Sequence, residues 1–349
     1  MVNGRSGTTT LRDVAAAAGV SITTASRILN GRPSGVPIRD DTRLRILAVA
    51  AELGYRPNLL ARGLRGSRSS LLGVIVRDIA DPFHVQVLRG VNEIARDRDY
   101  RLFLGHVDYR PDVAEIYGSM FEQSHADGII VIGDIVGGQA ALDGLSARHR
   151  FVVGVSDRID RRRAPGVYID NIAGTRLALD HLWGLGHRSI LCVSDERTAD
   201  GPLRAEVYEA YLRERGEADR IRVHFTTQPD PAPSYRLGRE LFGHYDRPTR
   251  PTAIFAASDT IAIGLIQAAF HARIRLPEQL SIVGFDDIDI AAFMVPPLTT
   301  VSQSGVEMGR AAGSLLLDMI EHDLDASDVA DIVLTPSLVV RQSTAPPAA

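Results

Sequence analysis

The stretch Leu11-Arg-Asp-Val-Ala-Ala-Ala-Ala-Gly-Val-Ser-Ile-Thr-Thr-Ala-Ser-Arg-Ile-Leu-Asn30 predicts two short helices around one tight turn. The first helix has one apolar face at helical spacing, made by Leu11, Val14, Ala15 and Ala18. Thr10 and Asp13 form a capping-box pattern at its start, and Gly19 is typical of a helix end. Ser21 can cap the second helix.

The second helix has two unlike faces. We expect Val20, Ala25 and Ile28 to face the first helix. The other face has hydroxyls, an amide and one guanidinium but no acid, from Ser21, Thr23, Thr24, Ser26, Arg27 and Asn30. Such a face suits contact with DNA phosphates and base edges, as in a helix-turn-helix. A helical hairpin of no particular function would show the same pattern.

The composition is that of a globular protein with a small domain and one large or two medium ones: 349 residues, 45% hydrophobic and 23% charged. We find no membrane-spanning apolar run, and the first residues do not resemble a signal peptide. The single cysteine, Cys192, is typical of a reducing cytoplasm and predicts a buried thiol. We therefore expect a cytoplasmic, nucleoid-associated protein without membrane contact.

Charge is distributed unevenly along the chain. Residues 1–70 contain eleven arginines and only four acids, whereas the remainder contains fewer arginines than acids. A basic head on an acidic body indicates an anionic partner for the head alone.

Beyond the first two helices, the head continues with a third helix over 40–53, whose apolar pattern includes Leu44, Leu47, Ala48 and Ala51. Pro57 then interrupts the chain, and a short helix from Asn58 to about Arg65 is weakened by Gly63 and Gly66. Since such a short helix is marginal in water, we expect it to form only against a partner.

The head motifs occur in the order Asp13-Val-Ala, Gly19-Val-Ser, Ser26-Arg27, Asn30-Gly, Thr42-Arg, Leu53-Gly-Tyr-Arg-Pro-Asn58, Ala61-Arg and Leu64. This series resembles the lac repressor (LacI/GalR) family of bacterial transcription regulators. The resemblance implies that Ile22, Thr23 and Arg27 read bases and that Thr10, Ser21, Thr24, Ser26 and Asn30 hold phosphates. It places Asn58, Ala61, Leu64 and Arg65 on a hinge helix, with Leu64 wedged into the minor groove.

The head departs from the family pattern at two points. The loop from Gly31 to Ile38 is longer than usual, and Arg39 stands where a Ser or Thr usually caps the third helix, so we expect Asp40 to take over the cap. Ile22 offers only an apolar contact to DNA, for example to a thymine methyl group. The operator sequence therefore cannot be copied from relatives.

After Leu71, short apolar runs alternate with helical patterns. The predicted strands are 71–76, 102–105, 128–133, 151–155, 189–193, 221–226, 253–257 and 281–285. Two such sets indicate two doubly wound lobes with parallel sheets covered on both faces. The resemblance implies the same fold: an all-α helix-turn-helix head and an α/β, two-lobed, periplasmic-binding-protein-like core.

We predict a DNA-binding domain over 1–57, a hinge and linker over 58–70, an effector and dimerisation core over 71–344, and a tail over 345–349. The first lobe comprises about 71–169 and 304–328, and the second about 170–303 and 329–344. The chain is expected to cross between lobes near 169, 303 and 328. A helix over 304–321 presents Met308, Ala311, Ala312, Leu315, Leu316 and Met319 on one face, for lobe packing or dimerisation.

Polar residues just after strands are the site candidates, because ligands of these folds bind beyond the carboxyl ends of the strands. The candidate effector contacts, most of them placed by the resemblance, are Phe83, His84, Asp157, Arg204, Ser258, Asp286 and Gln303. Arginine, aspartate and amide groups around a phenylalanine suit a hydroxyl-rich sugar. Ser258 and Val207 replace more usual family residues, which leaves the effector's identity open, and Asp157 is equally suited to a structural cap.

Two other groups of polar residues are interpreted as structural and not as metal or catalytic sites. The run Asp286-Asp287-Ile-Asp289 lacks the residues that complete a calcium loop, and His181 and His187 suit a structural role at a helix end. We find no catalytic constellation and no cofactor fingerprint, so we expect neither an enzyme, nor a metal, nor a cofactor.

The sequence therefore predicts a homodimeric DNA-binding regulator, and a repressor in particular. It would bind a pseudo-palindromic double-stranded operator under the control of a small-molecule effector, which we expect to be a sugar. A purine or other non-sugar effector is the alternative within this class. A solute-binding protein, or a sugar-processing enzyme, is the alternative from another class.

Overall fold

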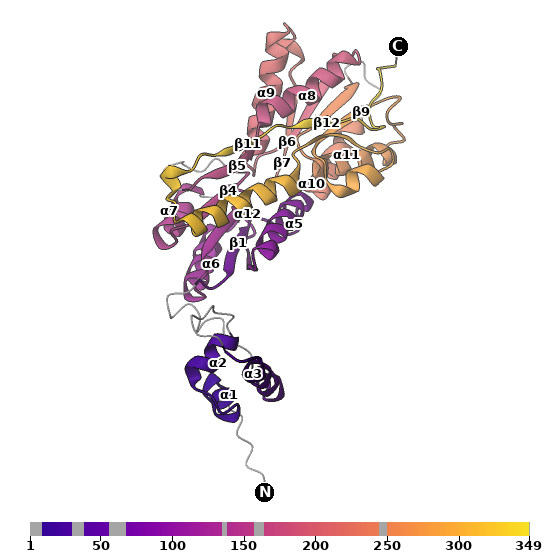
Figure 1. Ribbon diagram of the computed structural model, residues 1–349. Helices are drawn as coiled ribbons and strands as arrows, with labels where there is room; N and C mark the ends of the chain where they lie inside the picture. The colour runs from indigo at the N-terminus through magenta and orange to yellow at the C-terminus, as the bar shows by residue number, and fades with distance from the viewer. Residues whose placement is uncertain are drawn as a thin grey trace. The chain divides into compact units, whose positions relative to one another are not determined.

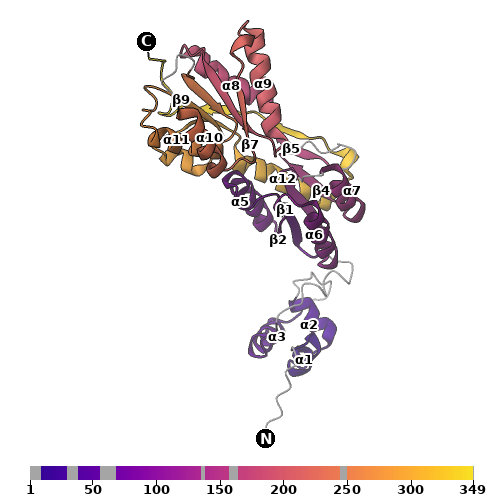
Figure 2. The same cartoon turned by 180° about the vertical axis from the view of Figure 1, so that it is seen from behind.

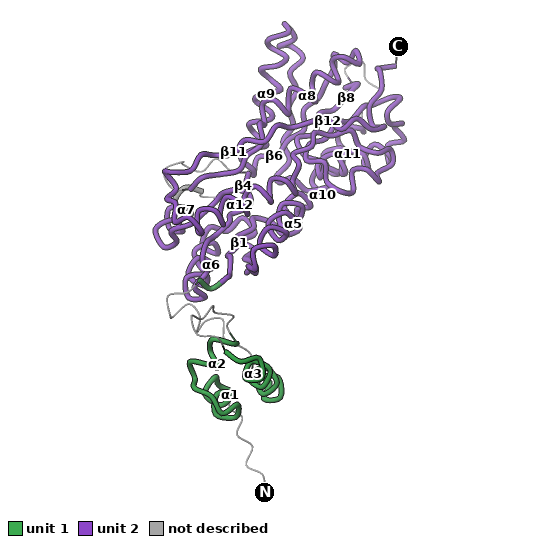
Figure 3. Tube along the Cα trace, viewed as in Figure 1, with its two compact units in different colours: residues 1–69 green, residues 70–349 purple. Residues whose placement is uncertain are grey.

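The computed structural model describes residues 9–29, 38–55, 68–134, 138–156, 164–243 and 250–348. The chain divides into two compact units, residues 1–69 and 70–349 (Figure 3). No helix within the described ranges is long and apolar enough to span a bilayer.

The first unit contains α1 (Leu11–Ala17), α2 (Ile22–Leu29) and α3 (Asp40–Glu52). The predicted caps of its first two helices are confirmed. Thr10 and Asp13 form the complete capping box of α1, and the Ser21 hydroxyl accepts the Thr24 N–H at 3.0 Å. Gly19 adopts φ 64°, the left-handed conformation that ends α1 without a steric penalty.

Two predictions for α3 are wrong. Its buried side chains are Ile46 and Ala50, whereas Leu44 and Leu47 are 66% and 43% exposed. Arg39, not Asp40, occupies the N-cap position, and no side chain caps this helix; Asp40 is its first residue. There its carboxylate is next to the positive end of the helix dipole, which favours an acid without any cap hydrogen bond.

The second unit contains two six-stranded sheets, and the predicted strands are confirmed in both. The first sheet has the order β11-β5-β4-β3-β1-β2 and the second β12-β10-β9-β8-β6-β7. All pairs are parallel except β10 with β12. The strands are β1 (Leu71–Val76), β2 (Arg101–His106), β3 (Gly128–Ile132), β4 (Val152–Val155), β5 (Gly166–Ile169), β6 (Ile190–Asp195), β7 (Val223–Thr226), β8 (Ala253–Ala256), β9 (Ser281–Asp286), β10 (Thr299–Ser302), β11 (Ile332–Leu334) and β12 (Ser337–Val339).

Helices cover both faces of each sheet, as Figures 1 and 2 show from opposite sides. The first sheet, with α5 (Pro82–Asp97), α6 (Pro111–Gln123), α7 (Gly138–Arg148) and α12 (Gly305–His322), forms the first lobe. The second sheet, with α8 (Asn171–Gly184), α9 (Asp200–Glu214), α10 (Pro231–Phe242) and α11 (Asp259–His271), forms the second lobe. The described part of this unit also contains the short 3-10 helices η1 (Ala218–Arg220), η2 (Asp289–Phe293) and η3 (Ala326–Asp328).

The helix predicted over 304–321 is α12, and its expected apolar face is confirmed. Met308, Ala312, Leu316 and Met319 are fully buried. Ala311 and Leu315, the other two predicted members of this face, are half-buried and pack against the same core. α12 packs closely on α5. A Cβ added to Gly309 would lie 2.0 Å from the Val87 carbonyl oxygen, so the two helix backbones leave no room for a side chain there. This face is therefore used inside the lobe.

Within the described ranges, the chain crosses between the two sheets after β5, after β10 and between β11 and β12. The first two crossings lie where they were predicted. The third was predicted near 328 and is wrong, because β11 still pairs with β5 of the first sheet. Residues 332–334, which we expected in the second lobe, therefore belong to the first.

Residues Thr344 and Ala345, near the C-terminus, are hydrogen-bonded to the second lobe. The His187 ring lies within 3.1 Å of the Ser281 hydroxyl and 2.9 Å of the Ala345 carbonyl oxygen, and the His181 ring lies 2.9 Å from the Thr344 hydroxyl. Both histidines thus have the structural role that we predicted. Cys192 is buried in β6, and burial raises the pKa of its thiol, which disfavours the reactive thiolate.

Candidate functional site

Helix α2 presents a polar surface opposite its packed face. Ala25 is fully buried, whereas Ser21, Thr23 and Arg27 are exposed and Ile22 is 42% exposed. Thr24 and Ser26 are half-buried at the edge of this surface. The three residues expected to read bases therefore all lie on the solvent side of α2.

The hydroxyl groups expected to hold phosphates are held by the helix ends themselves. The Thr10 hydroxyl donates to the Asp13 carboxylate at 2.7 Å, and the Ser21 and Thr24 hydroxyl oxygens lie 2.8 Å apart. The bond to Thr10 lowers the pKa of Asp13, which keeps this capping carboxylate ionised. These hydrogen bonds therefore hold the hydroxyl groups in place at the helix ends.

Several predicted site residues lie outside the described residues. They are Asn30, the hinge residues Asn58, Ala61, Leu64 and Arg65, and the candidate effector contact Asp157.

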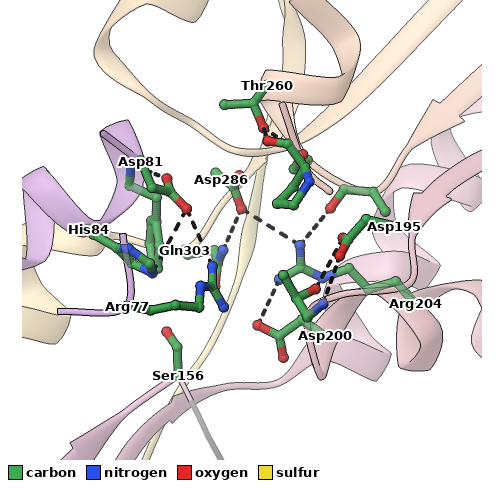
Figure 4. A pocket seen from close by; sticks show the side chains of 15 residues that line it. Arg77, Asp81, His84, Ser156, Asp195, Asp200, Arg204, Thr260, Asp286 and Gln303 are labelled. Carbon is green, nitrogen blue, oxygen red and sulfur yellow. Dashed lines mark hydrogen bonds and ion pairs between the residues drawn. The ribbon is translucent and has the colours of Figure 1, made fainter. Parts of the chain in front are cut away.

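The remaining six candidate effector contacts line one cavity between the two lobes (Figure 4). They are Phe83, His84, Arg204, Ser258, Asp286 and Gln303. The cavity has a volume of about 40 Å³, room for a few water molecules but not for a sugar ring. A larger ligand therefore requires the lobes to separate or side chains to turn.

Arg204 is the most extensively bonded side chain of this cavity. Its guanidinium donates to the Ala257 carbonyl oxygen at 2.6 Å and to the Asn171 side-chain oxygen at 2.9 Å. It also lies 3.6 Å from the centre of the Phe285 ring. Three kinds of contact thus fix the guanidinium, whose Nη1 is 3.7 Å from the Asp286 carboxylate.

Asp286 ends β9 inside the cavity, at a backbone φ of 123° that only a constrained turn maintains. Its carboxylate accepts a hydrogen bond from Gln303 Nε2 at 2.5 Å. Burial raises the pKa of Asp286 well above its ordinary value, and Arg204 offsets only part of that effect. Gln303 Oε1 is buried and accepts no hydrogen bond from any described residue.

The first lobe contributes a second charged wall. Asp81 caps α5 through the Phe83 N–H at 2.9 Å, and its carboxylate also lies 3.5 Å from the Arg77 guanidinium. His84 bonds the Asp78 carbonyl oxygen at 2.8 Å, and burial lowers the pKa of its ring, which favours the neutral imidazole. Phe83 is buried beside the start of α12.

The two lobes also touch directly at two places. At the first place, the Asp134 carboxylate of the first lobe pairs with Arg77 and accepts the Ala199 N–H of the second lobe at 3.0 Å. Beside it, Arg197 lies 3.9 Å above the Tyr109 ring. At the second place, Gln86 of α5 in the first lobe donates to the Asp289 carboxylate of η2 in the second lobe at 2.9 Å. The lobes are therefore in a closed arrangement.

A second cavity of about 130 Å³ adjoins the first and shares Asp81, Pro229 and Thr260 with it. Its lining also includes Asp78 and Asp230. Burial, together with the charge of Asp78, raises the pKa of Asp230.

The pocket contains further polar residues that the sequence reasoning did not single out as site residues. They are Arg77, Ser156, Asp195, Thr198, Asp200 and Thr260. Arg77 directly follows β1, Ser156 directly follows β4, and Asp195 ends β6. The strand-end rule, applied to every strand, would have found these three.

Asp259, beneath the pocket, makes stability depend on pH. It is fully buried, its carboxylate accepts bonds from Thr300 and the Ile288 N–H, and burial raises its pKa to about 7. The folded state therefore holds an extra proton between pH about 4 and about 7, so stability falls as pH rises through that range. Relative to Asp259→Asn, the wild type should lose about 2 kcal/mol from pH 5 to 7 in urea unfolding.

The exposed Asp219→Asn variant is the matched control for this measurement, and its pH profile should parallel that of the wild type. Parallel profiles for Asp259→Asn and the wild type would contradict the raised pKa.

Comparison with known proteins agrees with this architecture. Residues 10–58 match the model of bacterial regulatory proteins of the lacI family, and residues 179–344 match that of a periplasmic binding protein-like domain. A helix-turn-helix head and a two-lobed ligand-binding core define a ligand-responsive DNA-binding regulator. The HTH-type transcriptional regulator DegA of Bacillus subtilis (strain 168) is 34% identical, over 97% of this chain and 98% of its own. The chain belongs to the LacI family of DNA-binding transcriptional regulators and is not an enzyme.

Other comparisons extend over the same length. The HTH-type transcriptional repressor PurR of Haemophilus influenzae (strain PittEE) is 30% identical, over 96% of this chain and 98% of its own. The lac repressor dimer bound to operator and an anti-inducer has the same fold, with a TM-score of 0.82 at 24% identity, over 97% of this chain and all of that chain. The regulator CelR, solved as a cellobiose complex, has a TM-score of 0.68 at 28% identity, over 96% of this chain and 99% of its own.

Proposed function

We propose that this chain is a repressor that binds operator DNA and releases or holds it according to a small molecule bound between its lobes. The observation that carries the proposal is the closed inter-lobe cavity, where Arg204 and Asp286 of one lobe face Arg77 and Asp81 of the other. A ligand that binds one lobe arrangement better than another shifts the equilibrium between them by its difference in affinity.

For the head, we propose that Ile22, Thr23 and Arg27 contact base edges. Thr10, Ser21, Thr24, Ser26 and Asn30 would contact phosphates, and Asn58, Ala61, Leu64 and Arg65 would enter the minor groove from the hinge. The exposed, acid-free surface of α2 supports the first group. The head ends at about residue 57, and residues 58–70 connect it to the core. This division assigns sequence choice to α2 and the effector response to the core.

For the effector, we propose a sugar or sugar derivative. Sugar hydroxyls both donate and accept hydrogen bonds, and the cavity offers carboxylates, guanidinium groups and an amide at close quarters. The CelR structure contains a sugar, cellobiose. Asp157 is a further proposed contact that follows β4.

We also propose a homodimer, whose contact surface includes an apolar patch made by Val85, Ile290, Phe293 and Val295. Phe293 and Val295 are 79% and 89% exposed. Val85 belongs to α5 and Phe293 to η2, and these elements meet where Arg89 pairs with Asp289 at 3.2 Å. Large exposed apolar side chains in one patch mark interaction surfaces, and two copies of one patch form a closed two-fold dimer.

Phe293→Asp should weaken this dimer by about thirtyfold or more, the effect of losing one aromatic hot spot. Sedimentation equilibrium measures the change, and unfolding by heat checks that the fold is retained. Phe225→Asp is the matched control, because Phe225 is an exposed aromatic residue on the edge strand β7. An unchanged dimer in Phe293→Asp would remove this surface from the interface.

Two measurements on the full chain test the proposed function. Selection from random double-stranded DNA should enrich a near-palindrome, as two-fold symmetry requires. A thermal-shift screen of sugars, nucleobases and nucleosides should find a sugar that raises the melting temperature, because a ligand of the native state stabilises it. No enriched site would reject the regulator, and stabilisation only by a nucleobase or nucleoside would reject the sugar.

A further inference from the structure

Arg77 is a buried cation with one donor unused. Its side chain is only 9% exposed, yet its Nε donates to no described residue. Its terminal nitrogens are engaged with two carboxylates, Asp134 and Asp81. A buried donor without a partner is unfavourable, so a partner supplied from the cavity would be favoured.

Gln303 presents the complementary atom in the same cavity. Its amide nitrogen is used by Asp286, which leaves Oε1 as a buried acceptor without a donor from the described chain. Arg77 and Gln303 line the same pocket, together with Asp286 and Arg204 (Figure 4). One unused donor and one unused acceptor thus belong to side chains that line the same cavity.

Asp134 connects this pair to the closure of the lobes. One carboxylate pairs with Arg77 and also accepts the Ala199 N–H, immediately before the helix that carries Arg204. Asp134 and Arg77 follow neighbouring strands, β3 and β1, of the first lobe, whereas Ala199 belongs to the second. A change at Arg77 therefore acts directly on a contact between the lobes.

We propose that Arg77 is an effector contact and that Asp134 is the positioning residue that transmits its state to the second lobe. The inference rests on the proposed function and deepens it. The ligand group that satisfies both unused atoms accepts from Arg77 Nε and donates to Gln303 Oε1, as a hydroxyl does. The charge of Arg77 is already paired with the carboxylates of Asp134 and Asp81, so this position needs no anionic ligand and takes a neutral polyhydroxylated one.

Ligand binding is tested with ribose, glucose and cellobiose as probes in thermal shift and titration calorimetry on the full chain. Arg77→Met keeps the length of the side chain but removes every donor, and it should weaken binding of whichever probe stabilises the wild type by about tenfold or more. Arg110→Met is the matched control, because Arg110 belongs to the same lobe as Arg77, lies outside the cavity, is 63% exposed and pairs with Asp112 of its own lobe. Its probe affinity should stay within about twofold of the wild type. Equal probe affinity in Arg77→Met and the wild type would overturn the contact.

Positioning is tested without any ligand, by amide hydrogen exchange. Asp134→Ala removes the acceptor of the Ala199 N–H, so exchange at Ala199 should accelerate about tenfold or more while exchange in β3 is unchanged. Asp134→Asn keeps an acceptor oxygen and should restore much of the protection. Unchanged exchange at Ala199 in Asp134→Ala would overturn the inter-lobe link.

The two proposals fail in different ways. If a sugar stabilises the wild type and Arg77→Met alike, the sugar proposal stands and the Arg77 inference falls. If none of the three probes stabilises the wild type, the neutral-sugar class is rejected for this site, and the exchange result at Ala199 alone decides the role of Asp134.

Discussion

Arg27→Ala is expected to abolish the preference of this protein for its operator over random DNA. A planar guanidinium on an exposed helix face binds a guanine edge through two hydrogen bonds, and one such contact is worth about 1–3 kcal/mol. A dimer loses that contact at both half-sites. Since Arg27 is exposed, the substitution leaves the packing of α2 intact.

The measurement is fluorescence anisotropy with the selected operator and with a scrambled duplex, at one salt concentration. Arg45→Ala is the control, because Arg45 is an exposed arginine of α3, outside the surface of α2. It should weaken both duplexes alike through lost charge. A retained operator preference in Arg27→Ala would remove α2 from sequence recognition.

Arg204→Met should abolish the effector response and leave operator binding in place. The guanidinium holds the Ala257 carbonyl and Asn171 and is the nearest cation to the buried Asp286. Without it, the cavity loses the guanidinium group of the second lobe, so affinity for the effector should fall by about a hundredfold or more. Without the cation, the pKa of the buried Asp286 should rise further, because Arg204 is the group that opposes the effect of burial.

The matched control is Arg213→Met on the same helix, whose guanidinium is 57% exposed and pairs only with Glu209 among the contacts described for it. Operator affinity with and without the stabilising sugar is measured for both variants. An effector response in Arg204→Met equal to that of the wild type would place the ligand elsewhere.

The sequence was sufficient for elements whose signals are local. The capping box at Thr10 and Asp13 depends on two residues three apart, and the strand Leu71–Val76 is apolar because both faces of its sheet are covered. The same strand pattern predicted two lobes and the sheet edges at which Asp286 and Ser258 lie.

The wrong or missed predictions concern residues whose sequence pattern is compatible with more than one structural role. The apolar side chains of α3 point to nearly every side of the helix, so their spacing could not distinguish the buried Ile46 from the exposed Leu44. β11 has only three residues, and its partner β5 is far away in the chain. From the sequence alone, Arg77 is an ordinary charged residue after a strand, because two helices and two strands separate it from its partner Asp134.

The apolar patch of Val85, Ile290, Phe293 and Val295 takes side chains from both lobes of one chain. If two copies form a dimer through this patch, any rotation of one lobe against the other moves Val85 of the first lobe relative to Ile290, Phe293 and Val295 of the second. The second copy must then follow or lose contact, so one occupied chain makes closure easier in its neighbour. Effector saturation should consequently be steeper than a single-site curve, and it should revert to single-site form in Phe293→Asp.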